Sequence, residues 1–294
     1  MSAASATTGA AARPPRQLAL WFKAYPTLLR IGLAEAVAYR AEMLVWMLTM
    51  TMPLVSIVLW SSAAEGVRLG PEQLGSDELT AYFLITLLLR LLTGSWVLWQ
   101  ISEDIRSGTL AQRLLRPVPP LVVYTAEQLA PVPMRAALVA PLSLTLLLTQ
   151  ARTQLTGDPW LVAAFVLALP GAWAINFLTM ALLGMMAFYI DSAVGLFYVW
   201  TGIYTLFSGY LMPLSLFPLW MQKLSDFLPF RYMLDAPVKM LLGWPIVGGA
   251  RDTAAGREQA FISLGIEYAY VAVLMVLVAL LWRRGLRRFA AFGA

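Results

Sequence analysis

The chain has 294 residues, of which 60% are hydrophobic and 13% are charged, a composition typical of an integral membrane protein rather than a soluble enzyme. The complete lack of cysteine and histidine excludes thiol and imidazole catalysis, Cys/His metal sites and disulfides. The net charge of +5 does not indicate nucleic-acid binding, because the basic residues cluster beside apolar runs, where membrane orientation explains them.

The first 40 residues are expected to form a tail followed by helices that lie on the membrane surface. Residues 1–17 are rich in Ala, Ser and Thr and lack the apolar core of a signal peptide, which predicts a disordered cytosolic tail. The rest of the chain, residues 18–294, is expected to form a single transmembrane domain. Between residues 18 and 40, apolar residues alternate irregularly with charged ones, which suits interfacial helices.

Two predicted spans follow, separated by an acidic loop. The first, residues 42–62, is long enough to cross a hydrocarbon core of roughly 30 Å, and Pro53 should bend it. The second, residues 79–99, carries Arg90 at its middle. A charge at that depth is costly, so Arg90 should face a partner, a cavity or water.

The pattern of the polar interval from Ile101 to Leu121 predicts a short helix between two membrane segments. Ser102 is expected to cap a helical turn that opens with two acidic residues, and Gly108 interrupts that turn. Thr109 then restarts a helix with Gln112 at capping-box spacing, and prolines from residue 117 onward stop it. The pattern predicts a stiff amphipathic helix, which on its own is also typical of an interfacial helix resting on lipid headgroups.

Four more spans complete the prediction, at residues 136–150, 160–188, 193–212 and 261–282. The segment Pro213–Gly249 breaks this pattern, because its apolar pieces are aromatic, bounded by proline and too short to span. Such pieces lie in the interface or re-enter the membrane against protein.

The distribution of basic residues predicts the orientation. Thirteen of the 21 lysines and arginines fall in segments placed on the cytosolic side and seven in external ones, with Arg90 inside the membrane. Both termini are therefore expected in the cytosol, in a multi-pass protein of the plasma (inner) membrane with six spans.

The phrase I-R-S-G-T-L-A-Q-R-L-L-R-P-V, residues 105–118, resembles the cytosolic link between the second and third spans of ABC-2 type transporter permeases. The segment Pro213–Gly249 is similar to the external re-entrant hairpin of that family, and the stretch before the first span to its elbow helix. The resemblance implies an all-α fold of six transmembrane helices with an elbow helix, a coupling helix and a re-entrant hairpin. It also implies that the link docks into a separate ATPase through Glu103, Asp104, Arg106, Gly108, Leu110, Arg113, Leu114 and Leu115.

Several candidate residues keep two interpretations each. Arg90, Asn176, Tyr204 and Phe207 could line a substrate path or a subunit interface, or could serve only packing and intrabundle contacts. The aromatic residues of the hairpin could close the outer mouth or only anchor it in the headgroups; they are Phe217, Trp220, Phe227 and Phe230.

The leading hypothesis is the permease subunit of an ATP-driven ABC exporter. The chain has no Gly-Lys pair and hence no Walker A loop, so ATP and Mg would bind to partner ATPase subunits and no cofactor to this chain. The expected partners are those ATPases, a second permease, identical or paralogous, and membrane lipids, but no nucleic acid.

Two other classes of function are weighed against it. The alternative is a secondary transporter or channel without an ATPase, but the predicted spans are expected to hold no histidine and no deep acidic residue. An intramembrane enzyme is disfavoured, because the outer acidic residues Glu65, Asp158, Asp226 and Asp235 show no recognisable spacing.

Overall fold

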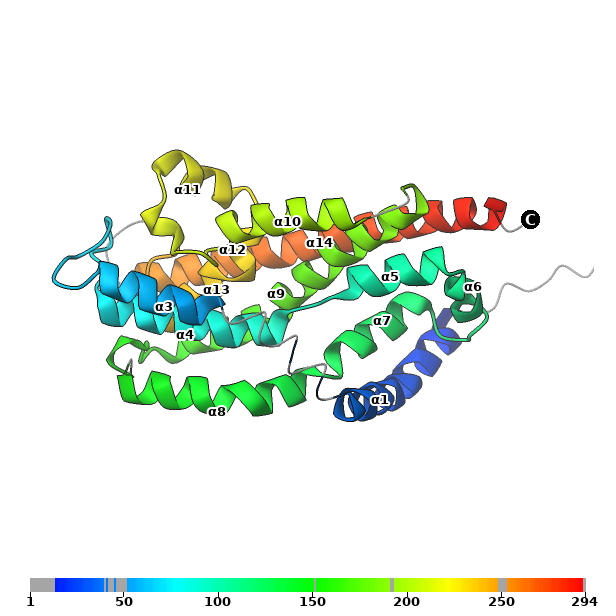
Figure 1. The fold of residues 1–294 in the computed structure, drawn as a ribbon, viewed down its shortest axis with the longest axis horizontal. Helices are drawn as coiled ribbons and strands as arrows, with labels where there is room; N and C mark the ends of the chain where they lie inside the picture. Colours follow the sequence, from blue (N-terminus) through cyan, green and yellow to red (C-terminus); the bar gives the residue numbers. More distant parts are fainter. Residues whose placement is uncertain are drawn as a thin grey trace, which may run out of the picture.

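The computed structural model describes residues 14–39, 41, 45, 52–150, 152–190, 193–247 and 253–292. Within these ranges the chain is almost entirely helical, and the only β-type pairing is an isolated bridge between Leu69 and Leu74. The helices form an elongated bundle with most axes along its length (Figure 1). The described helices are α1 (Pro14–Ala38), α3 (Met52–Ala63), α4 (Ser76–Thr93), α5 (Val97–Arg106), α6 (Thr109–Leu114), α7 (Pro120–Leu129), α8 (Val132–Gln150), α9 (Pro159–Met185), α10 (Val194–Phe207), α11 (Leu219–Asp226), α12 (Phe230–Met233), α13 (Asp235–Leu242) and α14 (Thr253–Phe292).

Three helical segments of the described chain are long and apolar enough to cross a membrane: Ser76–Arg106, Pro159–Phe188 and Ala254–Phe289. A fourth results if Pro120–Leu138 and Ser143–Thr149, which meet at a 46° bend, are counted as one span. Two further apolar helices, α3 and α10, are shorter. Much of the predicted first span, residues 42–44 and 46–51, lies outside the described residues.

The predicted second span differs from the structure in where it ends. The helical segment runs from Ser76 to Arg106, with a break at residues 94–96 between α4 and α5. The polar stretch that the sequence suggested as the start of a new helix is therefore the last part of α5. The backbone at Gly94 is extended, with φ −63° and ψ 133°, and this conformation ends α4 before α5 begins. Arg90 lies in the last turn of α4, near the middle of the segment Ser76–Arg106.

Long apolar helices that pack along one another form the core of the bundle. α14 packs along α9, while α4 contacts α3, α8 and α9, and α5 contacts α9. The buried face of α9 includes several small residues, among them Ala164, Ala168, Gly171 and Ala172, which allow close approach of the neighbouring helices. The start of α9 is capped by Asp158, whose carboxylate accepts a hydrogen bond from the Trp160 amide at 3.0 Å.

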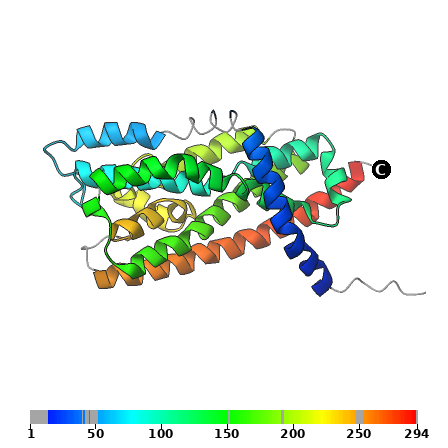
Figure 2. The same cartoon turned by 90° about the horizontal axis from the view of Figure 1, so that it is seen from below.

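The two ends of the bundle carry different structures (Figure 1). α11 and the loop between α3 and α4 lie at one end, and α6 and the last turns of α14 lie at the other. α1 runs obliquely across the long helices at the α6 end (Figure 2) and packs on α7, with Tyr25 Oη 3.4 Å from Thr125 Oγ1. Residues 14–17, which the sequence placed in the tail, form the first turn of α1. An exposed apolar set on α1 includes Ile31, Val37 and the following Tyr39.

Candidate functional site

The link between α5 and α7 is built around a left-handed turn at Gly108. Its φ of +77° is a conformation that L side chains rarely adopt, so glycine is needed there. Gly108 is also the residue that precedes α6, and Thr109 is the first helical residue. The predicted capping box from Thr109 to Gln112 is therefore wrong, because the turn starts the helix one residue earlier. The Thr109 hydroxyl lies 2.9 Å from the hydroxyl of Ser107 instead.

Ser102 was expected to cap a helix start, and this prediction is also wrong. Ser102 lies inside α5, on its buried side, and its hydroxyl donates to the Gly184 carbonyl of α9 at 3.4 Å. The following two acidic residues point in different directions: Glu103 is exposed, while the side chain of Asp104 is buried. The helix dipole argument that placed them at an N-terminus does not apply, since they lie near the C-terminal end of α5.

A partly buried cluster of ion pairs and hydrogen bonds joins the three helices of the link. We use "link knot" for Asp104 of α5, Arg113 of α6, and Tyr124 and Glu127 of α7. Arg113 Nε lies 2.7 Å from Asp104 Oδ2, its Nη1 lies 3.0 Å from Glu127 Oε1, and its guanidinium stacks 4.9 Å from the Tyr124 ring centre. Tyr124 donates a 2.6 Å hydrogen bond to Asp104. Burial alone would lower the pKa of Arg113, but the carboxylates of Glu127 and Asp104 outweigh it and raise that pKa.

The residues that the resemblance assigned to coupling fall into two groups: some are buried in the link and others are exposed on its surface. Asp104 and Arg113 bond to each other, and Leu110 lies fully buried on the inner face of α6. These three residues therefore hold the link together. Leu114 is 38% exposed and Leu115 is 88% exposed. Glu103 and Arg106 are exposed as well. The outer surface of the link therefore combines two leucines with charged side chains on a rigid base.

Arg90 contacts aromatic rings rather than a carboxylate. Its guanidinium carbon lies 4.8 Å from the ring centre of Tyr204 and 5.7 Å from that of Tyr210, and its Nη1 donates to Tyr204 Oη at 3.3 Å. None of the ion pairs found among the described residues involves Arg90. Its buried Nε has no hydrogen-bond partner there. Cation–π contact of this kind stabilises a desolvated cation within a bundle.

The other two residues of the predicted substrate path lie apart from this contact. Asn176 of α9 donates to the Thr93 carbonyl at the end of α4 at 2.8 Å, an interhelical bond at the break in the second span. Phe207 is the last residue of α10 and is half-buried. The structure thus brings Arg90 and Tyr204 together, while Asn176 bonds to the last residue of α4, next to the break.

The predicted gate residues of the hairpin fall into two pairs. Trp220 on α11 and Phe227 just after it are 65% and 80% exposed, and α11 projects from the bundle in Figure 1. Phe217 is buried, and Phe230 packs edge-on against Trp200 of α10 with ring centres 6.4 Å apart. Only the second pair is part of the packed body of the chain.

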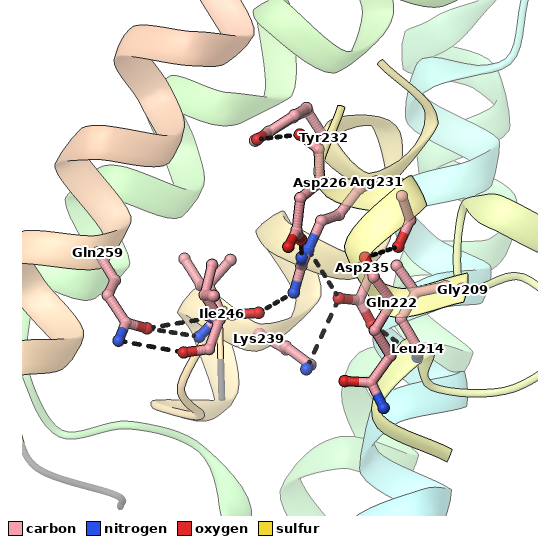
Figure 3. Close-up of polar contacts among 12 residues, drawn as sticks. Gly209, Leu214, Gln222, Asp226, Arg231, Tyr232, Asp235, Lys239, Ile246 and Gln259 are labelled. Atoms are coloured by element: carbon pink, nitrogen blue, oxygen red, sulfur yellow. Dashed lines mark hydrogen bonds and ion pairs between the residues drawn. The ribbon is translucent and has the colours of Figure 1, made fainter. Parts of the chain in front are cut away.

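The segment 213–247 contributes to a buried charged cluster that sequence reasoning missed (Figure 3). Asp235, which is fully buried, accepts hydrogen bonds from Tyr82 Oη of α4 at 3.1 Å and from the Leu214 amide at 3.3 Å. Its other oxygen faces Arg231 and Lys239, each 3.7 Å away. We call these residues, with Glu72 and Asp226, the outer network.

Each cation of the outer network has a second partner. Lys239 Nζ lies 3.1 Å from Glu72 in the loop between α3 and α4, and Arg231 bonds to Asp226 and to the Ile246 carbonyl. The network therefore ties α12 and α13 to α4 and to that loop. The sequence does carry a signal: Arg231, Asp235 and Lys239 follow at intervals of four residues, the spacing of helix neighbours.

The expectation that the spans hold no deep acidic residue is wrong. Glu267 lies inside the predicted sixth span and is 1% exposed on the face of α14 that packs on α9. The residue is visible in the sequence, within the apolar run that defines the span. The lack of a deep acidic residue, which argued against proton-coupled transport, therefore no longer holds.

The long apolar helices define a multi-pass helical membrane protein. A family model described as "ABC-2 family transporter protein" matches residues 77–293, and the chain belongs to that family. The comparison with curated proteins found no match. Membership makes the chain a permease component of an ABC transporter and a membrane transport component rather than a catalytic enzyme; permeases of this family generally pair with cytosolic ABC ATPases.

Proposed function

We propose that this chain is the membrane-spanning subunit of an ATP-driven exporter in the plasma membrane, with six spans and both termini in the cytosol. ATP and Mg bind to a separate cytosolic ATPase, and a second permease, identical or paralogous, completes the pathway. The observation that carries the proposal is the link: two exposed leucines lie at the end of α6, a helix that partly buried ion pairs hold to its neighbours.

The contacts of the link knot support a role of the link in transmitting motion from the ATPase to the membrane helices. Because Arg113 bonds to both Asp104 and Glu127, α5, α6 and α7 should move as one piece when α6 is pushed. α5 in turn continues into α4 across the break at residues 94–96. Motion of α6 would therefore reach the second span without distorting the link.

The break itself is held by polar contacts from the neighbouring helices. Gln128 of α7 accepts a 2.9 Å hydrogen bond from the Trp96 amide, and Arg135 of α8 donates to the Gly94 carbonyl at 3.2 Å. These bonds satisfy backbone groups that a continuous helix would pair internally. We place the pivot of the coupling motion at this break.

For the outer end, we propose that the hairpin closes the exit of the pathway. Phe217 and Phe230 would form its fixed inner part, and Trp220 and Phe227 its outer surface. The support is the outer network, which fixes α12 and α13 against α4 while α11 projects beyond them.

One observation supports the alternative of a secondary transporter, and another argues against it. Glu267 supplies the deep acidic residue that such carriers use. Family membership, however, favours ATP-driven transport, and the link has no evident role without an ATPase.

Replacing both Leu114 and Leu115 with Asp tests the docking role. Unpaired charges in a buried interface are expensive, so the double variant should insert normally but lose co-purification with its ATPase and stimulation of ATP hydrolysis. The matched control is Leu219→Asp, an exposed leucine on α11 at the opposite end, which should keep both. Recruitment of the ATPase by the double variant at the wild-type level would refute the docking assignment.

A further inference from the structure

A buried carboxyl group on α14 has no polar partner. Glu267 is 1% exposed, and neither of its carboxylate oxygens has a hydrogen-bond partner in the part of the chain that the structure describes. No ion pair found there includes it. The residue lies well inside the apolar segment Ala254–Phe289, which is long enough to cross the membrane. Nothing in the coupling or gating roles proposed above uses it.

The carboxyl group fits against a glycine on the facing helix. A Cβ atom added to Gly171 of α9 would lie 2.3 Å from Glu267 Oε1 and 2.7 Å from its Cδ. The carboxyl group therefore occupies the space that the missing side chain leaves open. We call this contact the α9–α14 seam.

The charged and titratable groups around the seam do not balance a negative charge on Glu267. α9 carries no Asp, Glu, Lys, Arg or Tyr between Pro159 and Met185. On α12 and α13, Arg231, Asp235 and Lys239 are engaged in the outer network. Arg257 of α14 pairs with Asp158 at the start of α9. The remaining titratable groups are tyrosines: Tyr232 on α12, and Tyr268 and Tyr270 on α14 itself. Tyr270 donates its hydroxyl proton to the Phe227 carbonyl, and Tyr268 to the Leu167 carbonyl.

An ionised carboxylate without a partner in this position would be strongly unfavourable, whereas the neutral acid needs no counter-charge. A metal cation is a poor occupant, because hard cations take six or more oxygen ligands and the carboxyl oxygens meet no other polar atom here. We propose that Glu267 is a proton-binding site, occupied by a proton while the α9–α14 seam is closed.

Proton occupancy and helix packing are then coupled. Opening the seam would admit water and let the carboxyl group ionise, and ionisation would in turn oppose closing. A group that binds its proton more tightly in the closed state stabilises that state at low pH, and the stabilisation is lost as the pH rises. This inference stands whether or not α6 docks an ATPase.

Infrared difference spectroscopy of the full chain in lipid vesicles tests the proposal. At about pH 7 an exposed glutamate is ionised, so a protonated carboxyl band that disappears in Glu267→Gln identifies the proton on Glu267. We expect the loss of one protonated carboxyl per chain. The matched control, Glu258→Gln, removes an exposed carboxyl from the same helix and should leave the band intact. A spectrum in which Glu267→Gln removes only ionised carboxylate signal at this pH would overturn the proposal.

Gly171→Ala provides a second test that leaves Glu267 in place. The added methyl group collides only with the flexible end of a side chain, so the helices should still pack while the carboxyl group is displaced. We expect the protonated band to shift in frequency and to be lost at a lower pH than in the wild type. An unchanged band in Gly171→Ala would show that the protonated group is not at the seam.

Discussion

At the residue scale, the charged side chains of this membrane protein differ mainly in how their charge is compensated. Asp235 is surrounded by two cations and two neutral donors, Arg90 by aromatic rings, and Glu267 by apolar atoms. Compensation of this kind decides whether a buried charge is structural or exchangeable.

Asp235→Ala should destabilise the folded protein strongly. The substitution leaves Arg231 and Lys239 buried with one partner fewer each, and breaking a buried pair in this way costs about 3–5 kcal/mol. Thermal unfolding in detergent measures the effect. Asp77→Ala, an exposed acidic residue at the start of α4, should change the unfolding temperature little. Equal unfolding temperatures for the two variants would show that the outer network contributes nothing to stability.

The contact of Arg90 with Tyr204 predicts an order among three substitutions. Tyr204→Phe keeps the ring beneath the guanidinium, whereas Tyr204→Leu removes a contact worth about 2 kcal/mol when desolvated. Arg90→Leu should fold, since it removes a charge from the bundle. Unfolding temperatures should therefore fall most for Tyr204→Leu and least for Tyr204→Phe. A Tyr204→Phe variant as unstable as Tyr204→Leu would mean that the hydroxyl contact at 3.3 Å, not the ring, holds the arginine.

The residue scale is also where prediction from sequence was weakest. The spacing of Arg231, Asp235 and Lys239 is local and visible, but their partners Glu72 and Tyr82 are more than 140 residues away in the chain. Asp104 was assigned to a helix start because a serine and two acidic residues are typical of one. Tertiary pairing with Arg113 decides its position instead.

At the element scale, long apolar runs predicted their helices well. The predicted fourth span, residues 160–188, matches the observed segment Pro159–Phe188, and the predicted sixth span lies within Ala254–Phe289. The helical segment of the predicted second span continues beyond residue 99 to Arg106, and its last turns carry the polar residues Ser102, which bonds to α9, and Asp104, which bonds to Arg113. The six-span count remains a proposal, since three or four segments of the described chain pass by length and composition.

The start of α9 should respond to acid. The hydrogen bond from Arg257 lowers the pKa of Asp158 below its usual value of 3.8, and the Trp160 amide adds to this effect. A depressed pKa means that the ionised form stabilises the folded state above the unfolded pKa, and that this contribution is lost as the pH falls through the folded pKa. The protection of the first-turn amides of α9 against hydrogen exchange, measured relative to the intrinsic exchange rate at each pH, should therefore fall below about pH 4, near the ordinary aspartate pKa.

Asp158→Asn provides the control for this acid response. It retains an acceptor for the Trp160 amide but cannot ionise, so the protection of the same amides, relative to the intrinsic exchange rate, should depend little on pH in this range. A wild-type chain with the same flat profile as Asp158→Asn would contradict the assignment.

At the scale of the whole molecule, α6 of the link and α11 lie towards opposite ends of the bundle (Figure 1). Our proposed topology places the α6 end in the cytosol and the α11 end outside. The chain has no cysteine, so single cysteines can be introduced at exposed positions without background. On intact cells an impermeant thiol reagent should label Lys223→Cys but not Gln112→Cys, and permeabilised cells should show both. Labelling of position 112 alone on intact cells would invert the topology.

The central claim is that α6 touches a separate ATPase, and site-directed cross-linking tests it most directly. A single cysteine at Leu115, the most exposed leucine of the link, should cross-link to the ATPase in membranes that contain both proteins. A single cysteine at Leu219, exposed at the opposite end, should not. We predict a cross-linked product at Leu115 whose yield changes when nucleotide binds. No product at Leu115 in a complex that still co-purifies and hydrolyses ATP would contradict the account.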